Sequence, residues 1–220
     1  MPPTLTNPEL VQLFEQITVQ INPDQILEIG ARQADFSYTM SSRLPDCRIT
    51  CFEANPVSFD QFGSRFSNIS NVGYLNLAVT DSNGPVQIRI PGGRDPENLT
   101  KGSASLLTRT NFPDTDYTEF TVPGHRLDDL IRDGSRIVQW LDVEGHLESV
   151  FAGGLDVLNR TVALFLEVES RPFWKGQWTD LNVFGFLERH GFRMVAQDRE
   201  SPEQYNVIFV RTEWTGDLEF

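Results

Sequence analysis

One stretch, Gln25–Ser37, constrains the fold more than any other part of the chain. Its first residues, 25–29, hold a short apolar run without a helical period that ends at Gly30, and this predicts a strand buried on both faces. Asp35 then predicts the cap of a following helix. Strand, tight turn and helix is how α/β proteins bind nucleotide-like cofactors, because the glycine admits the ligand and the helix N-terminus offers unpaired N–H groups.

A second stretch repeats this design about twenty residues later. Residues 48–56 predict a buried strand that ends in an acidic residue, Glu53, and is followed by a turn. An acid at the end of the second strand can accept hydrogen bonds from both hydroxyls of a ribose. A surface glutamate on an ordinary turn is the alternative, and the spacing from Gly30 favours the ribose.

The rest of the chain continues the alternation of strands and helices. Further strands are expected at residues 72–79, 136–143, 162–168, 192–196 and 206–211. Such alternation implies right-handed crossovers and a parallel sheet. We therefore predict an α/β fold with a doubly wound, mostly parallel seven-stranded sheet whose last strand is antiparallel.

We predict a single domain over residues 1–220, with an N-terminal helix in residues 1–24 that covers the sheet. Residues 91–123 form a loop and hairpin insertion, a candidate lid, because a long irregular stretch inside a compact domain is usually functional or mobile. Its final strand, near residues 117–122, is expected to pair with a half-exposed strand at residues 86–90.

Charge and cysteine content exclude several classes of function. The net charge is −13, with 31 acidic and 18 basic residues, so we expect no nucleic-acid partner and no membrane partner. Cys47 and Cys51 would lie about 13 Å apart along a strand, beyond disulfide reach, and they form no zinc cluster. The N-terminus is polar, without a signal or membrane-spanning run, so we expect a cytoplasmic protein.

Five segments resemble the FkbM-type methyltransferases: Leu27-Glu-Ile-Gly-Ala, Phe52-Glu-Ala-Asn-Pro, Leu127-Asp-Asp-Leu, Leu141-Asp-Val-Glu-Gly and Leu166-Glu-Val. The resemblance covers roughly residues 25–211. It implies the class I, Rossmann-like methyltransferase fold and S-adenosylmethionine as cofactor. The family usually has Asp, Asn and Gly where this chain has Glu28, Arg32 and Ala34.

The resemblance also implies an activity, O-methylation of a hydroxyl group on a small molecule, sugar or secondary metabolite. Whether the protein forms a homodimer is left open by the sequence. The runner-up is a catalytically inactive cofactor-binding or interaction module, for which Arg32 and Ala34 in the cofactor turn are the support. A nicotinamide oxidoreductase fits poorly, because the turn lacks the three-glycine pattern.

The site residues follow from these segments. We predict that the cofactor is bound by residues of the two turns and of later strand ends: Glu28, Gly30, Ala31, Arg32, Glu53, Ala54, Ala78, Ser105 and Asp142. Loops 102–105 and 171–178 are expected to select the acceptor, and exposed aromatic residues of the second could stack on a sugar ring.

The predicted catalytic residues are Asp142, Glu144 and His125. Asp142 is expected near the cofactor and Glu144 near the acceptor proton, and positions two apart share a face if the strand continues through Val143. His125 is the next candidate base. His146 could also take the proton, but an exposed helix residue is the favoured interpretation. A divalent metal at the same acidic segment stays open, although carboxylates beside a cationic cofactor need none.

Overall fold

The central element of the structure, a computed structural model, is an eight-stranded sheet. The structure describes residues 2–92, 95–113, 116–199, 201–214 and 216. The strands lie in the order β1-β10-β11-β9-β8-β2-β3-β4. Their bounds are β1 (Thr4–Leu5), β2 (Gln25–Ile29), β3 (Arg48–Phe52), β4 (Val72–Leu75), β8 (Ile137–Leu141), β9 (Thr161–Glu169), β10 (Phe192–Asp198) and β11 (Gln204–Arg211).

The strand directions confirm a mostly parallel sheet with an antiparallel last strand. Neighbours from β4 to β9 are parallel, whereas β11 runs antiparallel to both β9 and β10. The sequence predicted seven strands, and the eighth is the two-residue β1, which pairs with β10. Two residues carry no readable period, so this strand has no sequence signal.

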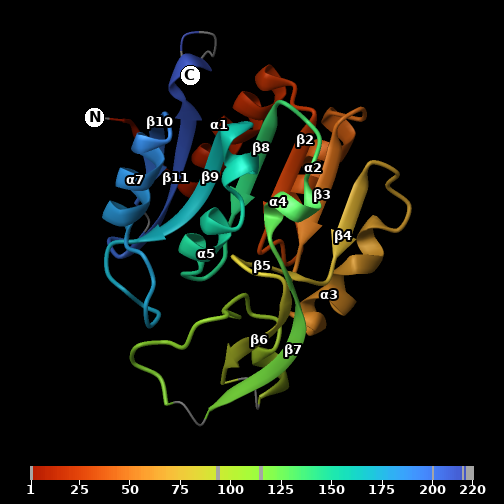
Figure 1. Cartoon of the computed structure of the whole chain (residues 1–220), viewed down its shortest axis with the longest axis vertical. Coiled ribbons are helices and arrows are strands. Elements are labelled where there is room, and N and C mark those ends of the chain that lie inside the picture. The colour runs from red at the N-terminus through yellow and green to blue at the C-terminus, as the bar shows by residue number, and fades with distance from the viewer. Residues whose placement is uncertain (1, 93–94, 114–115, 200, 215, 217–220) are drawn as a thin grey trace.

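Helices cover both faces of the sheet (Figure 1). They are α1 (Asn7–Ile21), α2 (Asp35–Arg43), α3 (Pro56–Phe62), α4 (Leu127–Leu130), α5 (Leu147–Ala152), α6 (Leu155–Asn159) and α7 (Asp180–Arg189). Within the described part of the chain, no helix is both long and apolar enough to span a membrane.

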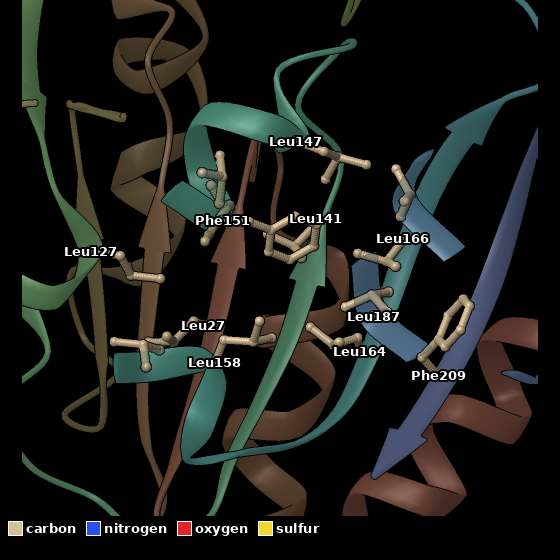
Figure 2. Close-up of a cluster of buried hydrophobic side chains, with 14 of the residues drawn as sticks. Leu27, Leu127, Leu141, Leu147, Phe151, Leu158, Leu164, Leu166, Leu187 and Phe209 are labelled. Carbon is tan, nitrogen blue, oxygen red and sulfur yellow. The ribbon is translucent and has the colours of Figure 1, made fainter. Parts of the chain in front are cut away.

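Two buried clusters hold these layers together. One lies under α1 and α2 and includes Phe14, Ile26 and Phe165. The other lies under α4, α5, α6 and α7, where Leu27 and Leu141 meet the helices (Figure 2). Ile26 and Leu27 are successive residues on opposite faces, so both faces of β2 are apolar, and this explains the continuous apolar run in the sequence.

A second, three-stranded sheet lies beyond one end of the main strands (Figure 1). It contains β5 (Ala78–Val79), β6 (Gly84–Pro91) and β7 (Tyr117–His125). The antiparallel β6–β7 pair confirms the expected pairing of residues 86–90 with 117–122. The predicted strand at residues 72–79 is divided, because residues 76–77 leave the main sheet and β5 joins the second one.

The insertion between β6 and β7 contains one 3₁₀ turn, Pro96–Asn98, and little other regular structure. Residues 93–94 and 114–115 of the candidate lid lie outside the described residues. Ser105 pairs with Arg89 as an isolated bridge and is buried, so the middle of the insertion is attached to β6.

Candidate active site

A cavity lies at the carboxyl ends of β2, β3 and β8, where ligands bind in open α/β sheets. Five stretches line it: Gly30 and Arg32, residues 52–55, residues 77–79, part of residues 101–106, and residues 142–146 without Gly145. The structure therefore brings most predicted site residues to one place, namely Gly30, Arg32, Glu53, Ala54, Ala78, Ser105, Asp142 and Glu144. Glu28, Ala31 and His125 are not among the lining residues.

Gly30 joins β2 to the cavity. It has φ +79°, and its amide donates to the carbonyl of Phe52 at 3.0 Å. A Cβ at this position would lie 1.6 Å from the carbonyl oxygen of Asp142. Glycine is therefore required at position 30 mainly because the ends of two strands come close together there, and the approach of a ligand is a secondary reason.

The turn after Gly30 uses two further left-handed residues, Arg32 at φ +44° and Ala34 at φ +51°. Asn and Gly, the usual family residues at these positions, tolerate this conformation better than Arg and Ala. The chain nevertheless forms the turn, and the Arg32 amide donates to Glu53 Oε2 at 2.6 Å.

Glu28 lies behind the cavity and fixes the start of α2. Its buried carboxylate accepts a hydrogen bond from the Ser37 amide at 2.8 Å. Asp35, which the sequence indicated as the cap, is instead the first residue of the helix, after Ala34. Burial raises the pKa of Glu28 to about 7, against the opposing effect of this hydrogen bond. Glu28 thus satisfies an unpaired helix N–H from the neighbouring strand.

Glu53 lines the cavity at the end of β3. Its two oxygens accept from the amides of Arg32 and Asn55, both at 2.6 Å. Burial raises its pKa to about 7. A carboxylate oxygen has two acceptor sites, so each oxygen can still accept from a ligand hydroxyl. The ribose contact of Glu53 stays a prediction that this position allows.

The acidic segment follows β8, which ends at Leu141 and not at Val143. Glu144 has φ +48° and Gly145 has φ +84°. The prediction that Asp142 and Glu144 share a face assumed that the strand continues through Val143, and it does not. Their carboxylate oxygens nevertheless lie within 4.8 Å of each other. A left-handed turn, and not strand alternation, brings them together.

Sequence reasoning missed two acids at the end of β9, Glu167 and Glu169. Glu167 lies within the same 4.8 Å group as Asp142 and Glu144, and Glu169 is buried nearby, bonded to Gln177 at 2.8 Å. The sequence did contain a signal for them, because two acids in an otherwise apolar strand are unusual, and this strand is parallel to β8. The sequence could not show that these two strands are adjacent.

The four acids have no basic partner within ion-pair distance in the described structure. Burial raises the pKa of Asp142, Glu144 and Glu167, and repulsion from Asp142 adds to it at Glu144 and Glu167. Burial likewise raises the pKa of Glu169 to about 7. The group therefore retains protons well above the pH at which ordinary carboxyls lose them.

His146 lines the cavity and His125 does not, which is the opposite of what the sequence predicted. His146 lines the cavity, its Nε2 is buried without a hydrogen-bond partner among the described residues, and burial lowers its pKa to about 4. It is therefore a neutral imidazole and not an exposed helix residue. His125 ends β7, where its carbonyl accepts from the Thr80 amide, and its side chain is outside the cavity lining.

The predicted selection loop 171–178 is joined to the insertion at residues 108–110, just beyond the other predicted loop, 102–105. The Thr110 amide donates to the carbonyl of Phe173, and Lys175 donates to that of Thr108, both at 2.8 Å. Trp174 is fully buried beneath this junction, with the Arg109 guanidinium 4.9 Å from its ring centre. Trp174 is thus a core residue and not an exposed stacking platform.

The insertion is also fixed to the cofactor turns. Asn55 Nδ2 donates to the carbonyl of Leu99 at 2.6 Å, and Arg32 Nε to that of Thr100 at 2.9 Å. Ser105 Oγ donates to the carbonyl of Glu144 at 2.8 Å. One wall of the cavity therefore consists of the insertion.

Comparison with known proteins shows the family of the chain. Residues 28–194 match the methyltransferase FkbM domain. The chain belongs to the FkbM methyltransferase family. It is therefore an S-adenosylmethionine-dependent methyltransferase.

Individual relatives are more distant. The 2-O-methyltransferase NoeI of Sinorhizobium fredii (strain NBRC 101917 / NGR234) is 23% identical over 198 residues, 86% of this chain and 78% of that protein. Streptococcus pneumoniae Sp1610, solved with S-adenosyl-L-methionine, matches with a TM-score of 0.50 and 14% identity, over 94% of this chain and 73% of that one. At this identity the likeness shows the fold: the class I methyltransferase architecture.

The cavity residues fit the cofactor. Glu53 offers carboxylate oxygens that can accept from the hydroxyls of a ribose, and Ala54 and Ala78 add small apolar side chains to the cavity lining. Asp142 supplies negative charge that suits the ammonium or sulfonium of S-adenosylmethionine. When bound, this cofactor supplies an activated methyl group, and the protein holds and orients the two reactants.

Proposed function

We propose that this enzyme transfers a methyl group from S-adenosylmethionine to a hydroxyl oxygen of a small molecule, a sugar or a secondary metabolite. The observation that carries the proposal is a pair of proton acceptors in the cavity lining, Glu144 and His146. Glu144 Oε2 and His146 Nε2 are buried, line the same cavity, and have no hydrogen-bond partner among the described residues. A hydroxyl, unlike a thiolate or a neutral amine, must lose its proton to become a methyl ether.

Two further observations support an oxygen acceptor of modest size. The relative NoeI is a 2-O-methyltransferase, and 86% of this chain aligns with it. The net charge of −13 disfavours a nucleic-acid acceptor, because phosphate binding needs concentrated lysine and arginine.

In this proposal Gly30, Arg32, Glu53, Ala54, Ala78, Ser105 and Asp142 hold the cofactor. Arg32 lies beside its methionine end and Glu53 binds its ribose. Glu28 positions α2 from behind the cavity, and Glu144 or His146 accepts the proton of the hydroxyl. His125 has no role, because its side chain does not line the cavity.

The test is a methyl-transfer assay with labelled S-adenosylmethionine over a panel of sugars and hydroxylated small molecules, with mass analysis of the products. We expect an O-methyl product and, for the residue that is the base, a fall in turnover of about 10²–10⁴-fold in Glu144→Gln or His146→Asn. Glu188→Gln, an exposed change of the same kind in α7, is the control.

The runner-up, an inactive cofactor-binding module, predicts a different outcome. Calorimetry would then show S-adenosylhomocysteine binding without methyl transfer to any acceptor. Products methylated on nitrogen, sulfur or carbon would instead contradict the oxygen acceptor while leaving the family assignment intact.

A further inference from the structure

We propose that Asp142 and Glu144, which line the cavity, form with the neighbouring Glu167 a binding site for one hard divalent cation, such as Mg²⁺ or Mn²⁺. Each offers one carboxylate oxygen, and the three oxygens lie within 4.8 Å of one another. Oxygens on opposite sides of a bound Mg²⁺ are about 4.2 Å apart and those around Ca²⁺ about 4.8 Å, so the group has the size of one coordination shell.

The backbone explains how the three oxygens converge. β8 and β9 are parallel neighbours with Leu141 opposite Leu166, so Asp142 and Glu167 are the next residues of the two strands. Glu144 joins them through its left-handed backbone at φ +48°. This conformation is unfavourable for a non-glycine residue, so the surrounding fold holds Glu144 at this place.

A second observation, apart from the clustering itself, points to a missing partner. Glu144 Oε2 is buried and accepts no hydrogen bond from any described residue. An unsatisfied buried carboxylate oxygen is costly, and a cation is the partner that three converging carboxylates can share. Arg32 and Arg109 interact with these acids only through longer-range charge, since neither forms an ion pair with them in the described structure.

The neighbours of the three acids orient them without neutralising them. Gln204 Nε2 donates to Glu167 Oε1 at 2.8 Å. Glu169, bonded to Gln177 Nε2, adds a fourth negative charge nearby. Such outer hydrogen bonds are typical of groups that hold metal ligands in place.

The ligand set selects the kind of ion. All three ligand atoms are carboxylate oxygens, which suit Mg²⁺, Mn²⁺ or Ca²⁺, whereas zinc prefers nitrogen and sulfur ligands. His146 lines the same cavity but does not belong to the group within 4.8 Å. The cation would replace the protons that the acids otherwise retain.

The role of this ion in methyl transfer rests on the proposed function, whereas its binding does not. Beside the cofactor, a divalent cation lowers the pKa of a coordinated hydroxyl and orients it. Glu144 would then be a ligand, and His146 would be the proton acceptor left on this wall.

The test is calorimetric titration of EDTA-treated protein at pH 8 with MnCl₂ and, separately, MgCl₂. A thermal denaturation series accompanies it. We expect saturation at one site, with a dissociation constant below about 1 mM, and an increase in melting temperature that EDTA reverses. Glu144→Gln and Glu167→Gln should each weaken Mn²⁺ binding at least about 10-fold. Glu148→Gln, an exposed change in α5 with the same loss of charge, should bind as the wild type does.

Parallel titration with S-adenosylhomocysteine separates this inference from the proposed function and shows that each variant is folded. Cofactor binding with no Mn²⁺ uptake up to about 10 mM, ten times the weakest affinity expected, overturns the cation site alone. Unchanged Mn²⁺ binding in both glutamine variants overturns it as well. Mn²⁺ binding that Glu167→Gln abolishes, in a protein without methyl transfer, supports the site and counts against the proposed function.

Discussion

Two groups of carboxylates in and around the cavity differ in their partners. In the first group, Glu28 and Glu53 accept hydrogen bonds from the backbone amides of Ser37, Arg32 and Asn55. In the second group, Asp142, Glu144 and Glu167 face one another, and none of them forms an ion pair in the described structure. Burial raises the pKa of all five acids, so the difference lies in their partners.

This contrast divides the site into two halves. The preformed half contains Glu28 and Glu53, and the other half, with Asp142, Glu144 and Glu167, needs a further component. Backbone amides are fixed by the strands and turns, so they define the positions of Glu28 and Glu53 before any ligand binds. Converging acids instead repel one another, and a proton, a cation or a cationic ligand must relieve that repulsion. We therefore expect the positions of Glu28 and Glu53 to be rigid, and the state of Asp142, Glu144 and Glu167 to depend on pH and on bound cations.

The largest effect should come from the point where the two halves touch. In Gly30→Ala the new Cβ would lie 1.6 Å from the Asp142 carbonyl oxygen, which cannot move without separating β2 from β8. We expect a loss of more than about 4 kcal/mol in the free energy of unfolding, and with it cofactor binding. Chemical denaturation followed by circular dichroism measures this loss.

Gly176→Ala is the matched control for this change. Gly176 has a similar φ of +81°, but a Cβ there would meet nothing within 4 Å. Its substitution should cost only the backbone strain, about 1–2 kcal/mol. Equal losses in the two variants would mean that strain, and not the contact between strand ends, makes glycine necessary at position 30.

The second largest effect concerns the preformed half. Glu53→Gln keeps the shape of the side chain but replaces one acceptor oxygen with a donor that faces the amide of Arg32 or Asn55. Affinity for S-adenosylhomocysteine should fall by about 2–3 kcal/mol, roughly 30–150-fold, through loss of charge-assisted hydrogen bonds. Isothermal titration calorimetry measures it.

The same variant should also lower the stability of the ligand-free protein by about 1–2 kcal/mol, because one buried amide loses its acceptor. Glu53 therefore has both a structural and a binding role. Intact stability with reduced affinity would show that the backbone amides do not depend on Glu53. Intact affinity would contradict the ribose contact.

Much of this architecture could be read from the sequence, because it depends on local patterns. Apolar runs and their spacing located the strands, and Gly30 and Glu53 stood at recognisable strand ends. The place of Glu28 could not be read, because its contact depends on which face of β2 packs under α2. Glu167 was missed for a related reason, since its proximity to Asp142 depends on β8 and β9 being adjacent.

A third prediction concerns pH and tests the unrelieved charge. An acid whose pKa is raised on folding keeps its proton in the folded state after the unfolded chain has lost it, so stability falls as pH rises between the two values. Burial raises the pKa of Glu28, Glu53 and Glu169 to about 7, and that of Glu167 also lies above its ordinary value. The ligand-free, metal-free protein should therefore lose stability from pH 5 to pH 8.

Differential scanning calorimetry in EDTA tests this trend. We expect the melting temperature to fall by at least about 2–4 °C, equivalent to about 1 kcal/mol for a chain of this size. Glu167→Gln should reduce the fall and melt higher than the wild type at pH 8, because it removes one member of the repelling group. A flat profile, or a Glu167→Gln protein less stable than the wild type at pH 8, would show that the acids do not repel one another as the structure indicates.

The smallest effect concerns the cofactor turn, where Ala34 has φ +51° and is fully buried. Ala34→Gly should relieve about 1–2 kcal/mol of left-handed strain, offset in part by the loss of a buried methyl group worth about 0.8 kcal/mol. Ala31→Gly, three residues earlier in the chain, removes a similarly buried methyl from a residue without positive φ. It should destabilise the protein by about 1–2 kcal/mol, so urea denaturation should show Ala34→Gly to be clearly the more stable variant. Equal destabilisation by both changes would mean that the preformed half of the site carries no strain at Ala34, and that the glycine usual in the family at this position serves the ligand and not the turn.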